Sequence, residues 1–187
     1  MTTATIIRSE RPAAFVGVPA VLVETVFVAA TVLMPIAAHT FGWPVFVVLP
    51  MFWGVMLSGV VFGWKVGLVV GAVSPVLNFV LTGMPVAPLV PIMTVELAVY
   101  GALPALLAQK VFRGNLYPGM AISMIVGRLV VLAGYIMFLG GSEGLPGWLS
   151  MQFLPGLPMQ AAQVLLVPVI GGMIIRALRR DEGGNPA

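Results

Sequence analysis

Long apolar segments, separated by short connections rich in glycine and proline, make up most of the chain. A helix that crosses a membrane needs about 20 apolar residues. Six segments reach or approach that length: residues 13–38, 44–62, 65–81, 88–110, 117–139 and 155–178. The second and third are short and are joined by a tight turn around Gly63-Trp64, which is compatible with a tilted or partly re-entrant arrangement. The pattern predicts an all-α bundle of six transmembrane helices.

The composition supports a membrane location. Of the 187 residues, 60% are hydrophobic and 8% are charged, and the mean hydropathy is +1.10. A soluble domain is about 45–50% apolar and about 25% charged, so we interpret the chain as an integral membrane protein. It has no cysteine and one histidine, which argues against metal sites and Ser-His catalysis. We therefore expect no metal, no cofactor and no catalytic residues, and a net charge of +3 does not indicate a nucleic-acid partner.

Basic residues lie at alternate ends of the six segments. They precede the first segment, occupy the second and fourth connections and end the sixth: Arg8, Arg11, Lys65, Lys110, Arg113, Arg176, Arg179 and Arg180. Lysine and arginine are enriched in cytoplasmic loops, so both termini are predicted to be cytoplasmic. We divide the chain into a cytoplasmic segment (residues 1–12), a single six-helix membrane domain (13–178) and a disordered cytoplasmic tail (179–187).

Small residues recur at helical spacing in two places. Gly59, Gly63, Gly67 and Gly71 follow one another every four residues, a spacing that lets helix backbones approach closely in lipid. In the first segment, a stripe of small residues is compatible with docking of another membrane protein or with packing inside this chain. Its members are Ala13, Gly17 and Ala20.

Three ionisable residues fall deep inside predicted helices. At 1.5 Å per residue, Glu24, Glu96 and Arg128 all lie roughly 17 Å or slightly more from the cytoplasmic side. An uncompensated arginine at the bilayer centre costs at least about 3 kcal/mol. Arg128 is therefore expected either to form a structural ion pair with Glu96 or Glu24, or to meet an anionic group of a ligand while Glu96 orients it. We favour the ligand interpretation for Glu96 and Arg128, and packing for Glu24.

Other polar, aromatic and methionine side chains gather towards the predicted outer end. Their faces are expected to converge on one small-molecule site, although Met and aromatic stripes also occur in ordinary cores and a tryptophan near the interface also serves as an anchor. The candidate substrate-binding residues are Glu96, Arg128, Asn78, Tyr100, Gln163, Trp43, Met84 and Tyr135.

The stretch from Leu57 to Gly101 carries a resemblance to a known family. It contains the glycines from Gly59 to Gly71 with Ser74-Pro75, then Thr82-Gly83-Met84-Pro85, Pro91, Met93, Glu96 and Tyr100-Gly101. In these residues the chain resembles the substrate-binding (S) components of energy-coupling factor (ECF) transporters, which take up vitamins and related micronutrients in prokaryotes. The resemblance is strongest over residues 57–107.

The resemblance implies a six-helix fold with a ligand site near the outer face of a prokaryotic cytoplasmic membrane. The loops at residues 39–43 and 83–88 and the faces that bear Glu96, Arg128 and Gln163 would enclose the ligand. The implied partners are a vitamin-like molecule, a transmembrane coupling subunit and two ATPase subunits, so this chain itself would be no enzyme. Members of the family carry an Ala-x-x-x-Ala docking pattern on the first helix, whereas here Ala13 and Gly17 have that spacing.

Two other functions stay open from the residues. A stand-alone secondary transporter or channel would have the same composition. A membrane enzyme fits less well, because the sequence has no Gly-x-Ser-x-Gly elbow and no pair of neighbouring aspartates. The substrate is also open: a buried arginine favours a carboxylate or phosphate, whereas an arginine neutralised by Glu96 fits an uncharged ligand.

Overall fold

The computed structural model describes residues 18–42, 49–138 and 154–183. This part of the chain contains α-helices and one short 3₁₀ turn and no strand. The elements are α1 (Val18–Thr40), α3 (Pro50–Phe62), α4 (Trp64–Thr82), η2 (Ala87–Leu89), α5 (Val90–Lys110), α6 (Leu116–Phe138) and α8 (Leu154–Gly183). The prediction of an all-α bundle of six helices is confirmed.

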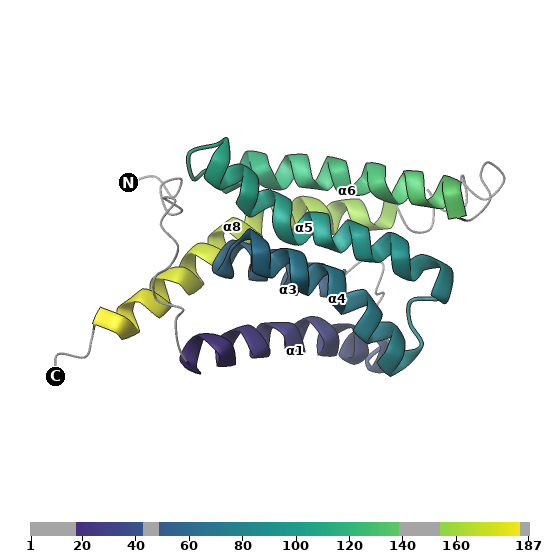
Figure 1. Ribbon diagram of the computed structural model, residues 1–187, viewed down its shortest axis with the longest axis horizontal. Coiled ribbons are helices and arrows are strands. Elements are labelled where there is room, and N and C mark those ends of the chain that lie inside the picture. The colour runs from purple at the N-terminus through teal and green to yellow at the C-terminus, as the bar shows by residue number, and fades with distance from the viewer. Residues whose placement is uncertain (1–17, 43–48, 139–153, 184–187) are drawn as a thin grey trace.

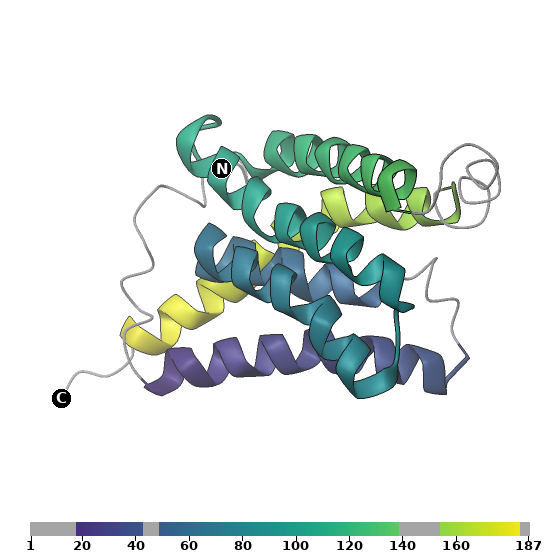
Figure 2. The same cartoon turned by 45° about the vertical axis from the view of Figure 1, so that its right-hand side comes forward.

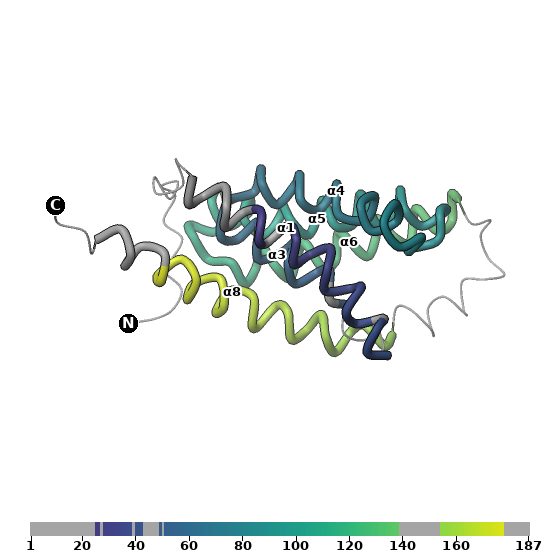
Figure 3. The backbone as a smooth tube through the Cα atoms, turned by 90° about the horizontal axis from the view of Figure 1, so that it is seen from below, coloured from purple at the N-terminus to yellow at the C-terminus, as the bar shows by residue number. Residues whose placement is uncertain are grey.

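The six helices run side by side and successive helices point in opposite directions (Figure 1). α1 and α6 lie on opposite sides of the bundle, with α3, α4 and α5 between them. Viewed from below, α8 runs along the side opposite α4 (Figure 3). The start of α1, the α3–α4 turn, the α5–α6 turn and the end of α8 share one end of the bundle (Figure 2). The α4–α5 connection, the end of α6 and the start of α8 share the other end.

The outside of the bundle is apolar, as in a protein that is solvated by lipid. Four helical stretches are long and apolar enough to cross a membrane: Trp64–Thr82, Ala87–Lys110, Leu116–Phe138 and Leu154–Ala177. Shorter apolar stretches are found in α1 and α3, at Val28–Ala38 and Met51–Phe62. Large apolar side chains such as Val80, Ile125 and Met137 are more than half exposed on the protein surface. The chain is a multi-pass membrane protein.

Within the described residues, the helix bounds differ from the predicted ones most clearly at the C-terminal end. α8 continues past residue 178 to Gly183, so the first part of the predicted disordered tail is helical; its Arg and Glu residues are good helix formers. α3 begins at Pro50, and proline fits the first turn of a helix because its missing N–H has no helical partner there. The second half of α4, after Pro75, lies closer to α1 than its first half does (Figures 1 and 2).

A single residue reverses the chain between α3 and α4. Gly63 has φ +98°, a backbone conformation that only glycine adopts without strain. Its N–H donates to the Gly59 carbonyl at 3.0 Å, and its own carbonyl accepts from the Gly67 N–H at 3.1 Å. A Cβ atom at Gly63 would meet open space, so glycine is needed here for the turn and not for helix packing, unlike its neighbours in the predicted ladder.

The other three glycines of the ladder lie against the backbone of α5. A Cβ at Gly59 or Gly67 would collide with the Gly101 carbonyl, and one at Gly71 would collide with the Leu97 carbonyl. A Cβ at Gly101 would in turn collide with the Gly67 carbonyl. We call these four residues (Gly59, Gly67, Gly71 and Gly101) the glycine interface. It holds α3, α4 and α5 at backbone contact, which is how small residues stabilise helix pairs where lipid supplies little hydrophobic driving force.

Candidate functional site

The candidate site begins on the face of α5 that carries Glu96 and Tyr100. Residues four apart lie one helical turn apart on the same face, so the carboxylate and the phenol are neighbours. Glu96 is 4% exposed and Tyr100 is completely buried. The Tyr100 hydroxyl lies beside Glu96 and also beside Gln160 of α8. A charged and a polar side chain are therefore enclosed at one place in an otherwise apolar bundle.

Arg128 of α6 connects this face of α5 to α8. Its Nη1 lies 3.6 Å from Oε1 of Glu96, within ion-pair distance. Its Nε donates a hydrogen bond to Oε1 of Gln160 at 3.1 Å. The guanidinium thus bridges a carboxylate from one helix and an amide from another, and its side chain is 15% exposed. The three helices α5, α6 and α8 meet at this arginine.

Gln163 extends the polar group along α8. It is three residues after Gln160, so it lies one turn further along α8 and about 60° around it. Its side chain is completely buried and that of Gln160 is 4% exposed. We call the five residues Glu96, Tyr100, Arg128, Gln160 and Gln163 the polar seam. One positive and one negative charge in the seam cancel.

Several polar atoms of the seam have no hydrogen-bond partner among the described residues. They are Oε1 of Glu96, the hydroxyl oxygen of Tyr100, Nε2 of Gln160, and both Nε2 and Oε1 of Gln163. Most buried side-chain polar atoms in proteins are paired, and leaving one unpaired costs about 1–3 kcal/mol. Unpartnered polar atoms around Arg128, followed by those of Gln163 one turn along α8, are typical of a site that receives a polar molecule.

Buried hydroxyls elsewhere in the bundle behave differently. Ser58, Ser74 and Ser123 each donate to a carbonyl of their own helix, at 2.5 to 2.8 Å. This local bond is open to serine and threonine because their hydroxyls are short. The longer glutamine and tyrosine side chains of the seam reach away from their own helices, so their partners must come from another helix or from a bound molecule.

The Tyr100 ring is held from two sides. Its centroid lies 5.4 Å from that of Phe52 on α3, at an interplanar angle of 48°. On the α6 side, the ring fills the space above Gly127, where a Cβ would collide with Cε1 and Cζ of the ring. Gly127 thus lets the tyrosine approach α6 closely, and the two contacts fix the direction in which the hydroxyl points.

The structure brings together three of the eight predicted binding residues, Glu96, Tyr100 and Arg128, and places a fourth, Gln163, one turn further along α8. Asn78 of α4 is 2% exposed, and its Nδ2 donates to the Ser74 carbonyl of its own helix at 3.4 Å. Met84 is 48% exposed in the α4–α5 connection. Tyr135 of α6 packs beside Ile92 and Val131. Trp43 lies outside the described residues.

The predicted docking stripe on the first helix falls largely outside the described residues. This applies to Ala13 and Gly17. Ala20 lies in α1, and the surroundings of its side chain are not described. Docking through this stripe stays a prediction.

Two residues of the site were not among the predicted ones. Gln160 is not among the candidate residues, although it makes the direct bond to Arg128. Two glutamines three residues apart in an apolar segment form a signal that sequence can supply. Gly127 carries no such signal, because its role depends on where the Tyr100 ring lies.

Comparison with known proteins gives one match. The family model described as "ECF transporter, substrate-specific component" matches residues 20–177. This range contains every helix from near the start of α1 to most of α8, and all five residues of the polar seam. No curated protein and no solved structure matches the chain.

Proposed function

Because the chain belongs to the substrate-specific components of ECF transporters, we propose that it captures a vitamin-like small molecule outside the cell and delivers it inward with an ATP-driven coupling module. The family is one of transporter subunits and not of enzymes. The polar seam is the proposed substrate site. The proposal is supported above all by the buried seam atoms that have no partner among the described residues.

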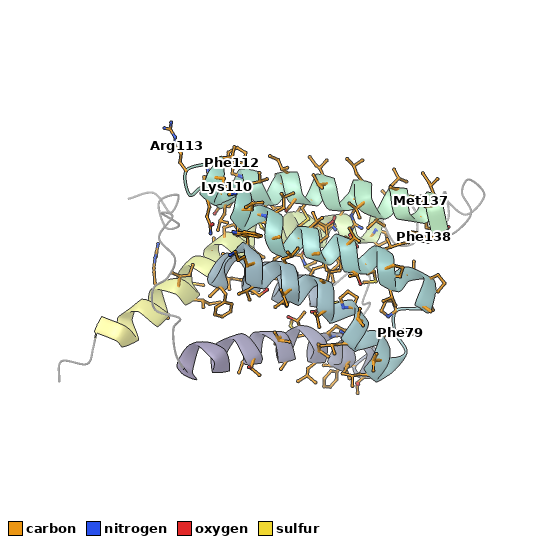
Figure 4. The ribbon with its side chains drawn as sticks, viewed as in Figure 1. Phe79, Lys110, Phe112, Arg113, Met137 and Phe138 are labelled. Carbon is orange, nitrogen blue, oxygen red and sulfur yellow. The ribbon has the colours of Figure 1, made fainter. Side chains whose placement is uncertain are left out.

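The direction of capture follows from the basic residues. Lys110 and Arg113 lie at the end of the bundle that also holds the last turns of α8 (Figure 4). Lysine and arginine favour the cytoplasmic side, so we place this end, and with it both termini, in the cytoplasm of a prokaryotic cell. Glu96 and Gln160 each lie six residues from the opposite end of their helices, roughly 9 Å. The seam is therefore closer to the outer face.

The α4–α5 connection is the proposed cover of the site. Gly83 ends α4 with φ +73°, and the connection then runs through Met84 to the 3₁₀ turn η2. Met84 and Val86 are both about half exposed, so their side chains can move without disturbing the packed core. Entry of a ligand requires some part of the bundle to open, since four of the five seam residues are less than 5% exposed.

The proposed partners are a transmembrane coupling subunit and two ATPase subunits. The first helix is the proposed docking element, through the predicted small-residue stripe at Ala13, Gly17 and Ala20, of which Ala20 lies in α1. The outer apolar surface faces the lipid bilayer. In this arrangement the chain supplies substrate selectivity and the partners supply the energy.

Purified chain tests the proposal. Native mass spectrometry and thermal shift against a panel of vitamins and their precursors should detect one ligand per chain, with nanomolar to micromolar affinity. Liposomes that contain the chain with its coupling module should then take up the ligand only when ATP is supplied. Uptake by the chain alone would instead support a stand-alone transporter or channel, and turnover of a lipid or peptide would support an enzyme.

A further inference from the structure

We infer that the substrate of this site carries no net charge and presents an amide-like edge, with a hydrogen-bond donor and an acceptor side by side, to the glutamines of α8. The inference rests on the proposed function, because it assigns a substrate class to the same site. It follows from two separate observations, the charge of the polar seam and the pattern of its unpartnered atoms.

The first observation concerns Arg128. An arginine in a membrane bundle usually indicates an anionic ligand, but here its guanidinium already has protein partners. Nη1 faces the Glu96 carboxylate at 3.6 Å, and Nε is bonded to Gln160. A carboxylate or phosphate that approached the guanidinium would also approach Glu96, and two like charges at close range are unfavourable in a poorly solvated site. The seam therefore disfavours an anion.

The second observation concerns the atoms that lack partners. Donors and acceptors are mixed: the Tyr100 hydroxyl, Nε2 of Gln160 and Nε2 of Gln163 can donate, and Oε1 of Gln163 can accept. Oε1 of Glu96 can also accept a hydrogen bond, beside its 3.6 Å ion pair with Arg128. A carboxylate or phosphate group offers acceptors only and would leave the acceptors of the seam unmatched. An uncharged polar molecule that both donates and accepts satisfies more of them.

Gln163 makes the match more specific. Neither end of its carboxamide has a hydrogen-bond partner in the described part of the chain, and the residue is completely buried. A carboxamide offers one donor and one acceptor side by side, and another amide, lactam or ureide edge can pair with it through two hydrogen bonds. Both hydrogen bonds can form in either orientation of the Gln163 carboxamide, because each orientation presents one donor and one acceptor. Gln160, one turn away, offers a further donor to the same ligand.

Matched pairs of probes test the charge assignment. Each pair keeps the skeleton and changes the charge: pantothenol with pantothenate, nicotinamide with nicotinate, and biotinamide with biotin. For any pair that binds, the purified full chain should bind the uncharged member at least about tenfold more tightly than the charged member. The Glu96→Gln variant, which removes the negative charge and keeps the side-chain shape, should reduce that preference at least about tenfold.

Two glutamine variants test the amide edge. Gln163→Leu should weaken binding of the preferred uncharged probe roughly 10- to 100-fold, the range expected when a buried polar partner is lost. Gln109→Leu makes the same chemical change at an exposed position of α5 and should leave affinity within twofold of wild type. A loss smaller than twofold in Gln163→Leu would overturn the amide assignment.

The remaining outcomes separate this inference from the proposed function. Native mass spectrometry of the freshly purified chain, which reads the mass of any co-purified molecule, accompanies the probe series. Tighter binding of the anionic probes, or a co-purified anion, would overturn the inference and leave the transport function intact. A folded chain that binds no probe and retains no small molecule would overturn the proposed function itself.

Discussion

The two faces of α5 pack against their neighbours in opposite ways. One face, with Leu97 and Gly101, meets α3 and α4 through the glycine interface, where backbone lies directly against backbone. The other face, with Glu96 and Tyr100, meets α6 and α8 through long polar side chains. The same helix thus belongs to a close-packed frame on one side and to the polar seam on the other.

The difference shows how one helix can combine rigidity with recognition. Backbone-to-backbone contact has little freedom, because neither partner can rotate away from an added atom. Long side chains can change rotamer and exchange one partner for another. We therefore expect α3, α4 and α5 to act as a fixed frame, and α6 and α8 to adjust around a ligand that enters the seam.

The largest effect is expected from a bulky residue in the glycine interface. Gly71→Leu places a side chain where even a Cβ collides with the Leu97 carbonyl and the Ala98 nitrogen. Overpacking at a backbone contact should cost at least about 3 kcal/mol, so the variant should yield little monodisperse protein in detergent. Val69→Leu, at an exposed position of the same helix, is the control and should elute and melt as wild type does. Equal melting temperatures for both variants would contradict a rigid frame.

Removing a charge from the seam should have the next largest effect, on binding and not on assembly. Arg128→Ala and Glu96→Ala each leave a partner charge unpaired and should weaken ligand binding more than about 100-fold, as expected for a buried charge pair. Both variants should remain extractable and monodisperse, because the glycine interface is intact. Isothermal titration and size-exclusion profiles measure the two quantities.

A double variant separates a binding role from a purely structural ion pair. Glu96→Gln combined with Arg128→Met removes both charges, so the thermal stability that a single variant loses should largely return. Ligand affinity should stay low, since the seam has lost its polar contacts. Wild-type ligand affinity in Arg128→Ala or in Glu96→Ala would show that the ion pair only holds the helices together.

The sequence predicted the frame well because its signals are local. Apolar segment lengths give the six helices, and the four-residue glycine spacing predicts close packing wherever it falls on one helix face. The exception is Gly63, whose position in the ladder matches the spacing but whose φ of +98° places it in the turn. Spacing alone cannot separate a glycine needed for packing from one needed for backbone conformation.

The seam could be predicted only in part. Its charged members were found because a charge in a membrane needs a partner, and helix lengths placed Glu96 and Arg128 at a similar depth. Which acid pairs with Arg128 depends on how helices are rotated against one another, which no local pattern contains. The same is true of Gly127, whose role is set by the Tyr100 ring on another helix.

A smaller effect is expected from Gly127→Ala, which changes the seam without touching its polar atoms. The added methyl group collides with the Tyr100 ring and should turn the hydroxyl away from Glu96 and Gln160. We expect ligand affinity to fall roughly tenfold, the cost of one misplaced hydrogen bond. Gly134→Ala on the same helix is the control, because there the added methyl also crowds a side chain, that of Ile92 at 2.9 Å, and touches no residue of the polar seam. An equal loss in both variants would remove Tyr100 from the proposed site.

The smallest effect is expected at Asn78, which tests whether the frame itself contributes to the ligand site. Asn78 was predicted to bind substrate, but its amide donates to Ser74 of its own helix, and α4 belongs to the frame. Asn78→Leu should therefore change ligand affinity less than about threefold and stability by about 1 kcal/mol or less, the range of a single weak hydrogen bond. Titration of the variant against wild-type protein measures the first quantity and thermal unfolding the second. A loss of affinity above about tenfold would show that α4 lines the site as well. The ligand would then contact the frame in addition to the polar seam.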